Sequence, residues 1–246
     1  MLATMGLAIA MAGCGDEDHT PPLVVSAASS MTEALEDCAP EFEETENADV
    51  RLSFAGSDEL AAQIRQGAPV DAYAAANTRL PDELYDEDLL SKPVEFATNE
   101  FVVGVPSDSG IDSVEDVAEE GIKVVVGSES VPIGSYTRET LAKLPPAQED
   151  AILSNVVSTE PDVKAIVGKL TQGAGDAGFV FVTDVNATGG ELRAIHLPAE
   201  LEPRGTYAAG VPTEAREPDL GQAFVDGLAT GPCADALEEA GFGGAP

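Results

Sequence analysis

Basic residues and histidines are both scarce in this chain of 246 residues. Lys and Arg together number 12, against 45 Asp and Glu, so the formal net charge at neutral pH is −33. A protein that binds nucleic-acid phosphates needs a basic face, and we therefore expect no nucleic-acid partner. Strong acidity favours solubility, and it agrees with a saline habitat in which dissolved salt screens the self-repulsion.

The two histidines, His19 and His196, are far apart and have no cluster of ligating residues near them. We therefore predict no metal site of the His and Cys type. A serine hydrolase, using Ser30 or Ser57, would need a base beside its nucleophile, and the sequence has no Gly-x-Ser-x-Gly elbow. These absences argue against an enzyme.

The N-terminal segment Leu2–Ala12 is apolar but too short to span a bilayer, and it suits the core of a signal peptide. Residues 11–14 resemble the lipobox of bacterial lipoproteins, which implies a lipid on Cys14. Residues 1–22 are then a lipoprotein signal and a polar tether, and the protein is expected outside the cytoplasm, anchored to the cell membrane. The alternative is an ordinary signal followed by a buried cysteine.

Two further cysteines remain if Cys14 carries a lipid. An even number of cysteines in an exported protein suggests a disulfide, here between Cys38 and Cys233. Two separate, packed thiols are the alternative.

A strand, a small-residue turn and a helix follow one another in residues 24–35. Ser30 and Glu33 fit a capping box, in which Ser30 is the N-cap of the helix. Free backbone N–H groups and the positive end of the helix dipole favour an anion at such a turn. Simple capping is the alternative role for Ser30.

The same arrangement recurs directly afterwards. A strand at 49–54 leads through a turn at 55–57 into a helix at 58–66, with Ser57 as its expected N-cap. Two serine-capped helix starts in one sheet layer can converge on one ligand. We expect the carboxylates of Asp58 and Glu59 to point away from that ligand, because they would repel an anion.

Strands and helices alternate along the chain, which is typical of an α/β protein with a helix-covered sheet. Ligands of such sheets lie beyond the carboxyl ends of the strands, where both serines fall. The pattern restarts near residue 97, and we expect two α/β domains with the chain crossing between them twice. The expected boundaries give domain I residues 23–98 plus 203–246 and domain II residues 99–202.

Seven short segments together resemble the extracytoplasmic molybdate-binding proteins of bacterial ABC importers. Their order and spacing carry the resemblance, over nearly all of the mature chain. The segments are 28–32, 54–57, 60–64, 67–71, 131–136, 161–163 and 179–184. The resemblance implies the two-domain periplasmic-binding-protein fold, with a ligand cleft between the domains and two crossover segments.

The resemblance also implies which residues bind the oxyanion. Matched by motif, the binding serines are Ser30 and Ser57, while Ile133 and Val163 contribute backbone N–H groups. Many family members have a ligand-binding tyrosine where this chain has Phe181, so one donor is missing. A water, Thr183 or Tyr136 could supply another.

The implied function is to bind molybdate, or the near-isosteric tungstate, and to deliver it to the membrane subunits of an ABC permease. The resemblance implies a monomer with no cofactor, and no metal beyond the molybdate oxyanion. The alternatives are a binding protein for another oxyanion or small solute, or a domain of this fold that has lost its ligand.

Overall fold

The computed structural model describes residue 20, residues 22–201 and residues 204–246. Cys14, the predicted signal and nearly all of the tether lie outside these residues. In the part of the chain that is described, no helix is both long enough and apolar enough to cross a membrane.

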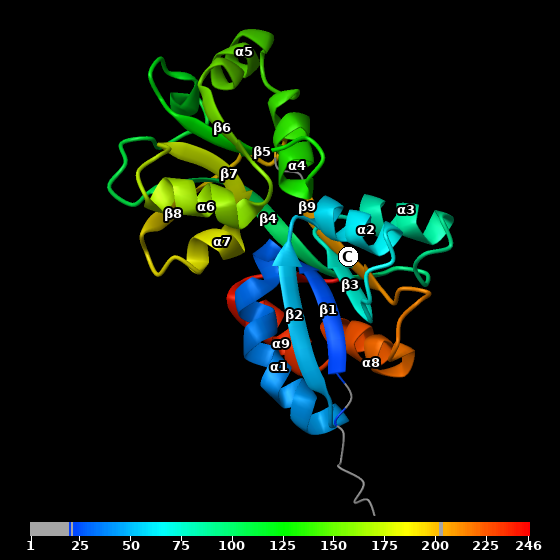
Figure 1. Cartoon of the computed structure of the whole chain (residues 1–246). Helices are drawn as coiled ribbons and strands as arrows, with labels where there is room; N and C mark the ends of the chain where they lie inside the picture. Colours follow the sequence, from blue (N-terminus) through cyan, green and yellow to red (C-terminus); the bar gives the residue numbers. More distant parts are fainter. Residues whose placement is uncertain (1–19, 21, 202–203) are drawn as a thin grey trace, which may run out of the picture.

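One part of the molecule is built on three parallel strands in the order β2-β1-β3. Its helices lie around these strands in Figure 1. The strands are β1 (Pro22–Ala28), β2 (Asp49–Ala55) and β3 (Ala72–Ala75), and the helices are α1 (Thr32–Glu46), α2 (Ser57–Arg65), α3 (Arg79–Asp86), α8 (Pro218–Ala229) and α9 (Pro232–Ala240).

A second group of elements, drawn green to yellow in Figure 1, follows along the chain. Its strands β7, β5 and β6 are parallel neighbours, and β8 pairs antiparallel with β4. The elements are η2 (Asp116–Ala118), β5 (Val124–Gly127), α4 (Pro132–Leu141), α5 (Pro146–Ser154), β6 (Val156–Glu160), α6 (Val163–Thr171), β7 (Ala177–Phe181), α7 (Val182–Asn186) and β8 (Leu192–His196).

The long strand β4 (Val94–Pro106) runs through both groups. Its first half pairs with β9 (Arg204–Gly210), and its second half, from Phe101, pairs with β7 and β8. Strand β9 also pairs antiparallel with β3, and the short β10 (Gly243–Gly244) pairs with β4. The sheet is therefore mixed, and the boundary expected between residues 98 and 99 falls inside one continuous strand.

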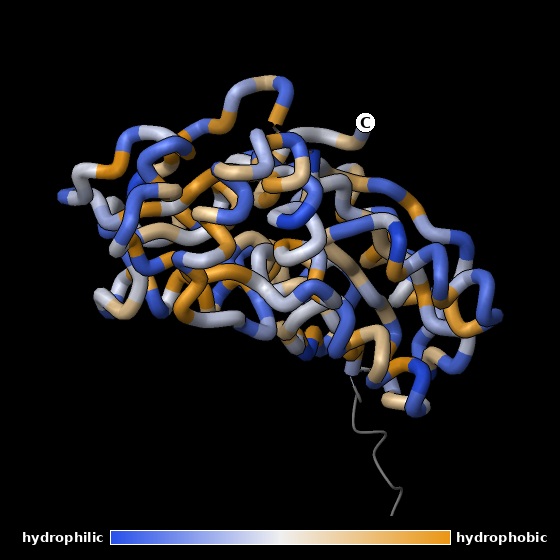
Figure 2. The backbone as a smooth tube through the Cα atoms, turned by 90° about the horizontal axis from the view of Figure 1, so that it is seen from above, coloured by the Kyte–Doolittle hydropathy of each residue, from blue (hydrophilic) through white to orange (hydrophobic). Residues whose placement is uncertain are grey.

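The core follows the apolar runs of the strands. Phe101, Val102, Val103 and Val105 of β4 are all fully buried, as expected for a strand covered on both faces. The coloured tube in Figure 2 shows such hydrophobic stretches alternating with hydrophilic loops.

A disulfide joins Cys38 of α1 to Cys233 of α9, which are 195 positions apart in the sequence. The ring of Phe42, also on α1, packs edge-on against Phe224 of α8 with centroids 5.2 Å apart. The C-terminal helices are thus tied to the helix that follows β1.

Candidate functional site

Four turns meet around a small cavity between the two groups of elements. The cavity has a volume of about 20 Å³. For comparison, a cavity that holds a single water needs roughly 10–15 Å³. It is lined by residues 28–30, 55–57, 131–133 and 162–163, together with Ala76 and Phe181. All five residues that the sequence singled out at the ligand, namely Ser30, Ser57, Ile133, Val163 and Phe181, therefore lie on one cavity.

The capping box at Ser30 is wrong. Residues Ser29–Met31 form a short 3₁₀ turn, η1, and α1 begins at Thr32 without a side-chain cap. The Oγ atom of Ser30 lies 2.8 Å from the phenolic oxygen of Tyr207 in β9. Glu33 instead accepts two hydrogen bonds from Lys164 of α6, at 2.7 Å each. The side chains of Ser30 and Glu33 therefore bind partners from other elements and do not cap the helix.

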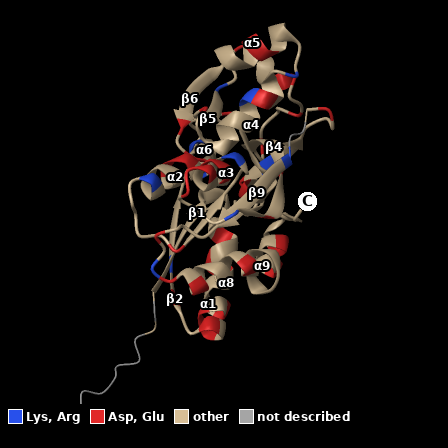
Figure 3. Cartoon of the chain, turned by 90° about the vertical axis from the view of Figure 1, so that its right-hand side faces the viewer, with Lys and Arg blue, Asp and Glu red and all other residues tan. Residues whose placement is uncertain are grey.

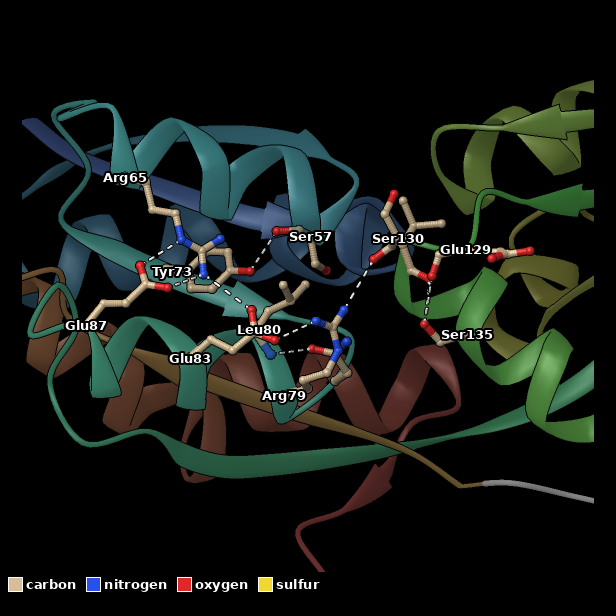
Figure 4. Close-up of polar contacts among 12 residues, drawn as sticks. Ser57, Arg65, Tyr73, Arg79, Leu80, Glu83, Glu87, Glu129, Ser130 and Ser135 are labelled. Atoms are coloured by element: carbon tan, nitrogen blue, oxygen red, sulfur yellow. Dashed lines mark hydrogen bonds and ion pairs between the residues drawn. The ribbon is translucent and has the colours of Figure 1, made fainter.

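Ser57 is also not an N-cap. Gly56 holds that position, and Ser57 is the first residue of α2. The backbone N–H of Ala76, just beyond β3, donates to the Oγ of Ser57 at 3.1 Å. Tyr73 donates its hydroxyl to the carbonyl oxygen of Ser57 at 2.7 Å (Figure 4). These contacts fix Ser57 at the carboxyl end of the sheet.

Ile133 and Val163 contribute helix starts from the opposite wall. Ile133 follows Pro132 at the first position of α4, and Val163 opens α6. Backbone N–H groups in the first turn of a helix have no acceptor within that helix, so both can donate into the cavity. Among the described residues that line the cavity, Asp162 alone carries a charged side chain, and its carboxylate caps α6 by accepting from Ala165 N at 2.9 Å.

The two walls are in close contact. A Cβ atom on Gly56 would lie 2.5 Å from the carbonyl oxygen of Pro161 on the other side. Tyr136 of α4 donates its hydroxyl to the carbonyl of Ala76 at 3.3 Å. Arg79 of α3 donates to the carbonyl of Ser130 at 3.4 Å, which Figure 4 shows spanning the two groups.

Figure 3 shows acidic residues on α1, α5, α8 and α9, among other elements. Neither Asp58 nor Glu59 is among the described residues that line the cavity. Glu59 is exposed and accepts from Gln63, whereas Oδ1 of Asp58 lies 2.9 Å from where a Cβ on Gly56 would be. Lys164 lies beside the cavity and faces Glu33 and, at 3.6 Å, the buried Asp184. Burial raises the pKa of Asp184 to about 7, although Lys164 opposes that rise.

Phe181 is buried and lines the cavity, and its side chain has no hydrogen-bonding group. The ring packs edge-on against Tyr207 and Tyr136, with centroids 5.8 and 6.0 Å away. The two side chains that could replace its missing hydroxyl are otherwise engaged: Tyr136 donates to Ala76, and Thr183 accepts from Asn99 at 2.8 Å. Neither Thr183 nor Tyr136 is among the described residues that line the cavity.

Tyr207 is the residue that sequence reasoning missed. No motif in the sequence links Tyr207 to Ser30, which lies 177 positions away. Among residues 20, 22–201 and 204–246, no group of three or more His, Cys, Asp or Glu is placed to hold a metal ion.

Comparison with known proteins gives one consistent result. Residues 23–243 match the family model described as bacterial extracellular solute-binding protein. The chain is 33% identical over 226 residues to the molybdate-binding protein ModA of Mycobacterium tuberculosis, covering 89% of this chain and 84% of that protein.

Two solved structures have a similar fold. One is the substrate-binding domain of a putative molybdenum ABC transporter from Clostridium difficile, with a TM-score of 0.68, 26% identity, and coverage of 91% of this chain and 99% of that one. The other is the periplasmic molybdate-binding protein of Azotobacter vinelandii, with a TM-score of 0.80, 19% identity, and coverage of 89% and 98%.

Proposed function

This chain belongs to the bacterial extracellular solute-binding protein family, and we propose that it binds molybdate in the cavity described above and delivers it to an ABC permease. It is a solute-binding protein and not an enzyme, and molybdate is its ligand and not a cofactor. Tungstate, which has nearly the same size and shape, is expected to bind in the same way.

The observation that supports the proposal is the convergence of neutral donors on one small cavity. Ser30 and Ser57 stand on one wall, and the helix starts at Ile133 and Val163 stand on the other. Such donors suit a doubly charged tetrahedral anion that carries no proton, because nothing in the ligand then needs an acceptor. The carboxylate of Asp162, which also lines the cavity, already accepts a hydrogen bond from its own helix.

Calorimetric titration with molybdate, tungstate, sulfate and phosphate tests the proposal. We expect binding of molybdate and tungstate, and absence of heat with both would reject the function. Ser30→Ala and Ser57→Ala should each weaken binding roughly tenfold or more, because each removes a hydrogen bond to a charged ligand. Ser154→Ala is the matched control, since this serine lies on α5, away from the cavity, and donates to Asp150 O.

A different oxyanion is the second candidate, and Phe181 is the observation that favours it. Phenylalanine cannot donate a hydrogen bond, so the cavity offers one donor fewer than the family resemblance implies. The same titration separates the two candidates, because a preference for sulfate over molybdate would support the second.

We also propose a domain organisation, an oligomeric state and a membrane anchor for this protein. Residues 23–98 with 203–246 form domain I, residues 99–202 form domain II, and the ligand lies between them. The protein acts as a monomer that is held at the outer face of the cell membrane by a lipid on Cys14. Mass spectrometry of the membrane fraction tests the anchor, since an unmodified Cys14 in the mature protein would contradict it.

A further inference from the structure

A line of buried hydrogen-bonding groups ends at the cavity. The amide nitrogen Nδ2 of Asn99 donates to the phenolic oxygen of Tyr207 at 3.4 Å, and that oxygen lies 2.8 Å from Ser30 Oγ. Asn99 and Tyr207 are almost fully buried, at 2% and 0% exposure, whereas Ser30 lines the cavity. We call Asn99, Tyr207 and Ser30 the hydroxyl relay.

The hydrogen bond from Asn99 allows a direction to be assigned to the protons along the hydroxyl relay. Because Asn99 donates to the oxygen of Tyr207, the phenolic proton must point to another acceptor. Among the described residues, the other hydrogen-bond partner of that oxygen is Ser30 Oγ. A buried hydroxyl without an acceptor is costly, so we assign Tyr207 as the donor to Ser30 in this bond. Burial also raises the pKa of Tyr207 well above its usual value, and the phenol therefore keeps its proton.

We propose that Tyr207 is a positioning residue that makes Ser30 an obligate donor to the bound oxyanion. Once Ser30 accepts from Tyr207, its own proton is directed into the cavity. Tyr207 thus acts on the ligand through Ser30, on a wall where Phe181 supplies no hydroxyl. The ligand oxygen that meets Ser30 must be unprotonated, as every oxygen of molybdate is. This inference rests on the proposed function.

The test is Tyr207→Phe, which removes the hydroxyl and keeps the ring packed edge-on against Phe181 and Phe242. We expect the Kd for molybdate to rise roughly tenfold, because Ser30 can then turn its proton away from the ligand. Thr140→Val is the matched control. It also removes a fully buried hydroxyl, one that donates to the carbonyl of Leu201 at 3.2 Å, and it should leave the Kd within about twofold.

A double-mutant cycle separates positioning from a general structural effect. If Tyr207 acts through Ser30, then Tyr207→Phe should change the Kd less than about twofold in a Ser30→Ala background. An equal loss in both backgrounds, or wild-type affinity of Tyr207→Phe, would overturn the inference while the proposed function stands. Absence of molybdate binding by the wild-type protein would overturn both.

A second variant covers the case in which Tyr207→Phe does not fold, as judged by its thermal transition. Asn99→Ala keeps Tyr207 and Ser30 but frees the phenolic proton to rotate. It should weaken molybdate binding by severalfold, and only while Ser30 is present. Wild-type affinity of a folded Asn99→Ala would then overturn the inference.

Discussion

Replacing Gly56 by alanine tests the close contact of the two cavity walls. Gly56 has φ −61° and ψ 137°, a conformation open to any residue, so the alanine backbone is not strained. Its Cβ would lie 2.5 Å from Pro161 O, whereas ordinary contact begins at 3.4 Å. The walls must therefore separate by about 0.9 Å (3.4 less 2.5 Å).

That separation decides the size of the expected effect. A hydrogen bond of about 2.9 Å would lengthen to about 3.8 Å, which is too long for a hydrogen bond. If the ligand stays on the wall of Ser30 and Ser57, it loses the donors at Ile133 and Val163. Two hydrogen bonds to a charged ligand, at 1.5 kcal/mol or more each, amount to about 3 kcal/mol, or roughly a hundredfold in Kd.

Calorimetric titration of Gly56→Ala with molybdate measures this loss, with circular dichroism to confirm the fold. Alanine is a weaker N-cap than glycine, so a small loss of stability in the free protein is also expected. The control is Gly227→Ala in α8, where an added Cβ meets nothing within 4 Å. This control should bind like the wild type and gain about 0.5–1 kcal/mol in stability. A Kd for Gly56→Ala within threefold of the wild type would refute the reasoning.

Two further predictions concern stability. Burial raises the pKa of Asp184 from 3.8 to about 7, against the opposing charge of Lys164 and with Glu33 nearby. The folded state then holds this proton more tightly than the unfolded chain, so the stabilising contribution is present below pH 3.8 and is lost as pH rises through about 7. The melting temperature of Asp184→Asn relative to wild type should therefore rise from pH 4 to pH 7, and a constant difference would contradict the assignment. Replacing both Cys38 and Cys233 by serine should lower the free energy of unfolding by about 2–5 kcal/mol, because the disulfide closes a very long loop. Denaturant unfolding with and without reductant measures this, and equal midpoints for the oxidised protein and the double variant would exclude it.

Local sequence signals located the cavity wall that carries Ser30 and Ser57 but assigned the wrong role to Ser30. The Ser-x-x-Glu pattern predicted that Ser30 and Glu33 would satisfy each other's backbone groups. In the structure Ser30 contacts Tyr207, and Glu33 pairs with Lys164 from another helix. A pattern of four residues describes only local partners, and a tertiary contact of similar or greater strength can replace them.

The strand from Arg204 to Gly210 shows the same limit. No local pattern in residues 204–210 predicted the place of this segment in the sheet. Strand β9 lies antiparallel between β3 and β4, and this pairing brings Tyr207 to Ser30. Which strands become neighbours depends on the path of the whole chain, so periodicity within β9 could not decide it.

The sequence by itself determined the alternation of strands and helices, the two strand–turn–helix units that carry Ser30 and Ser57, and the resemblance that adds Ile133 and Val163. These properties follow from short-range periodicity and from residues that lie close together along the chain. Only the tertiary structure decided that all four residues line one cavity and that Tyr207 meets Ser30 there. The direction of a hydroxyl proton depends on the hydrogen-bond partners that lie nearest in space, and Tyr207, the partner of Ser30, lies 177 positions away in the chain.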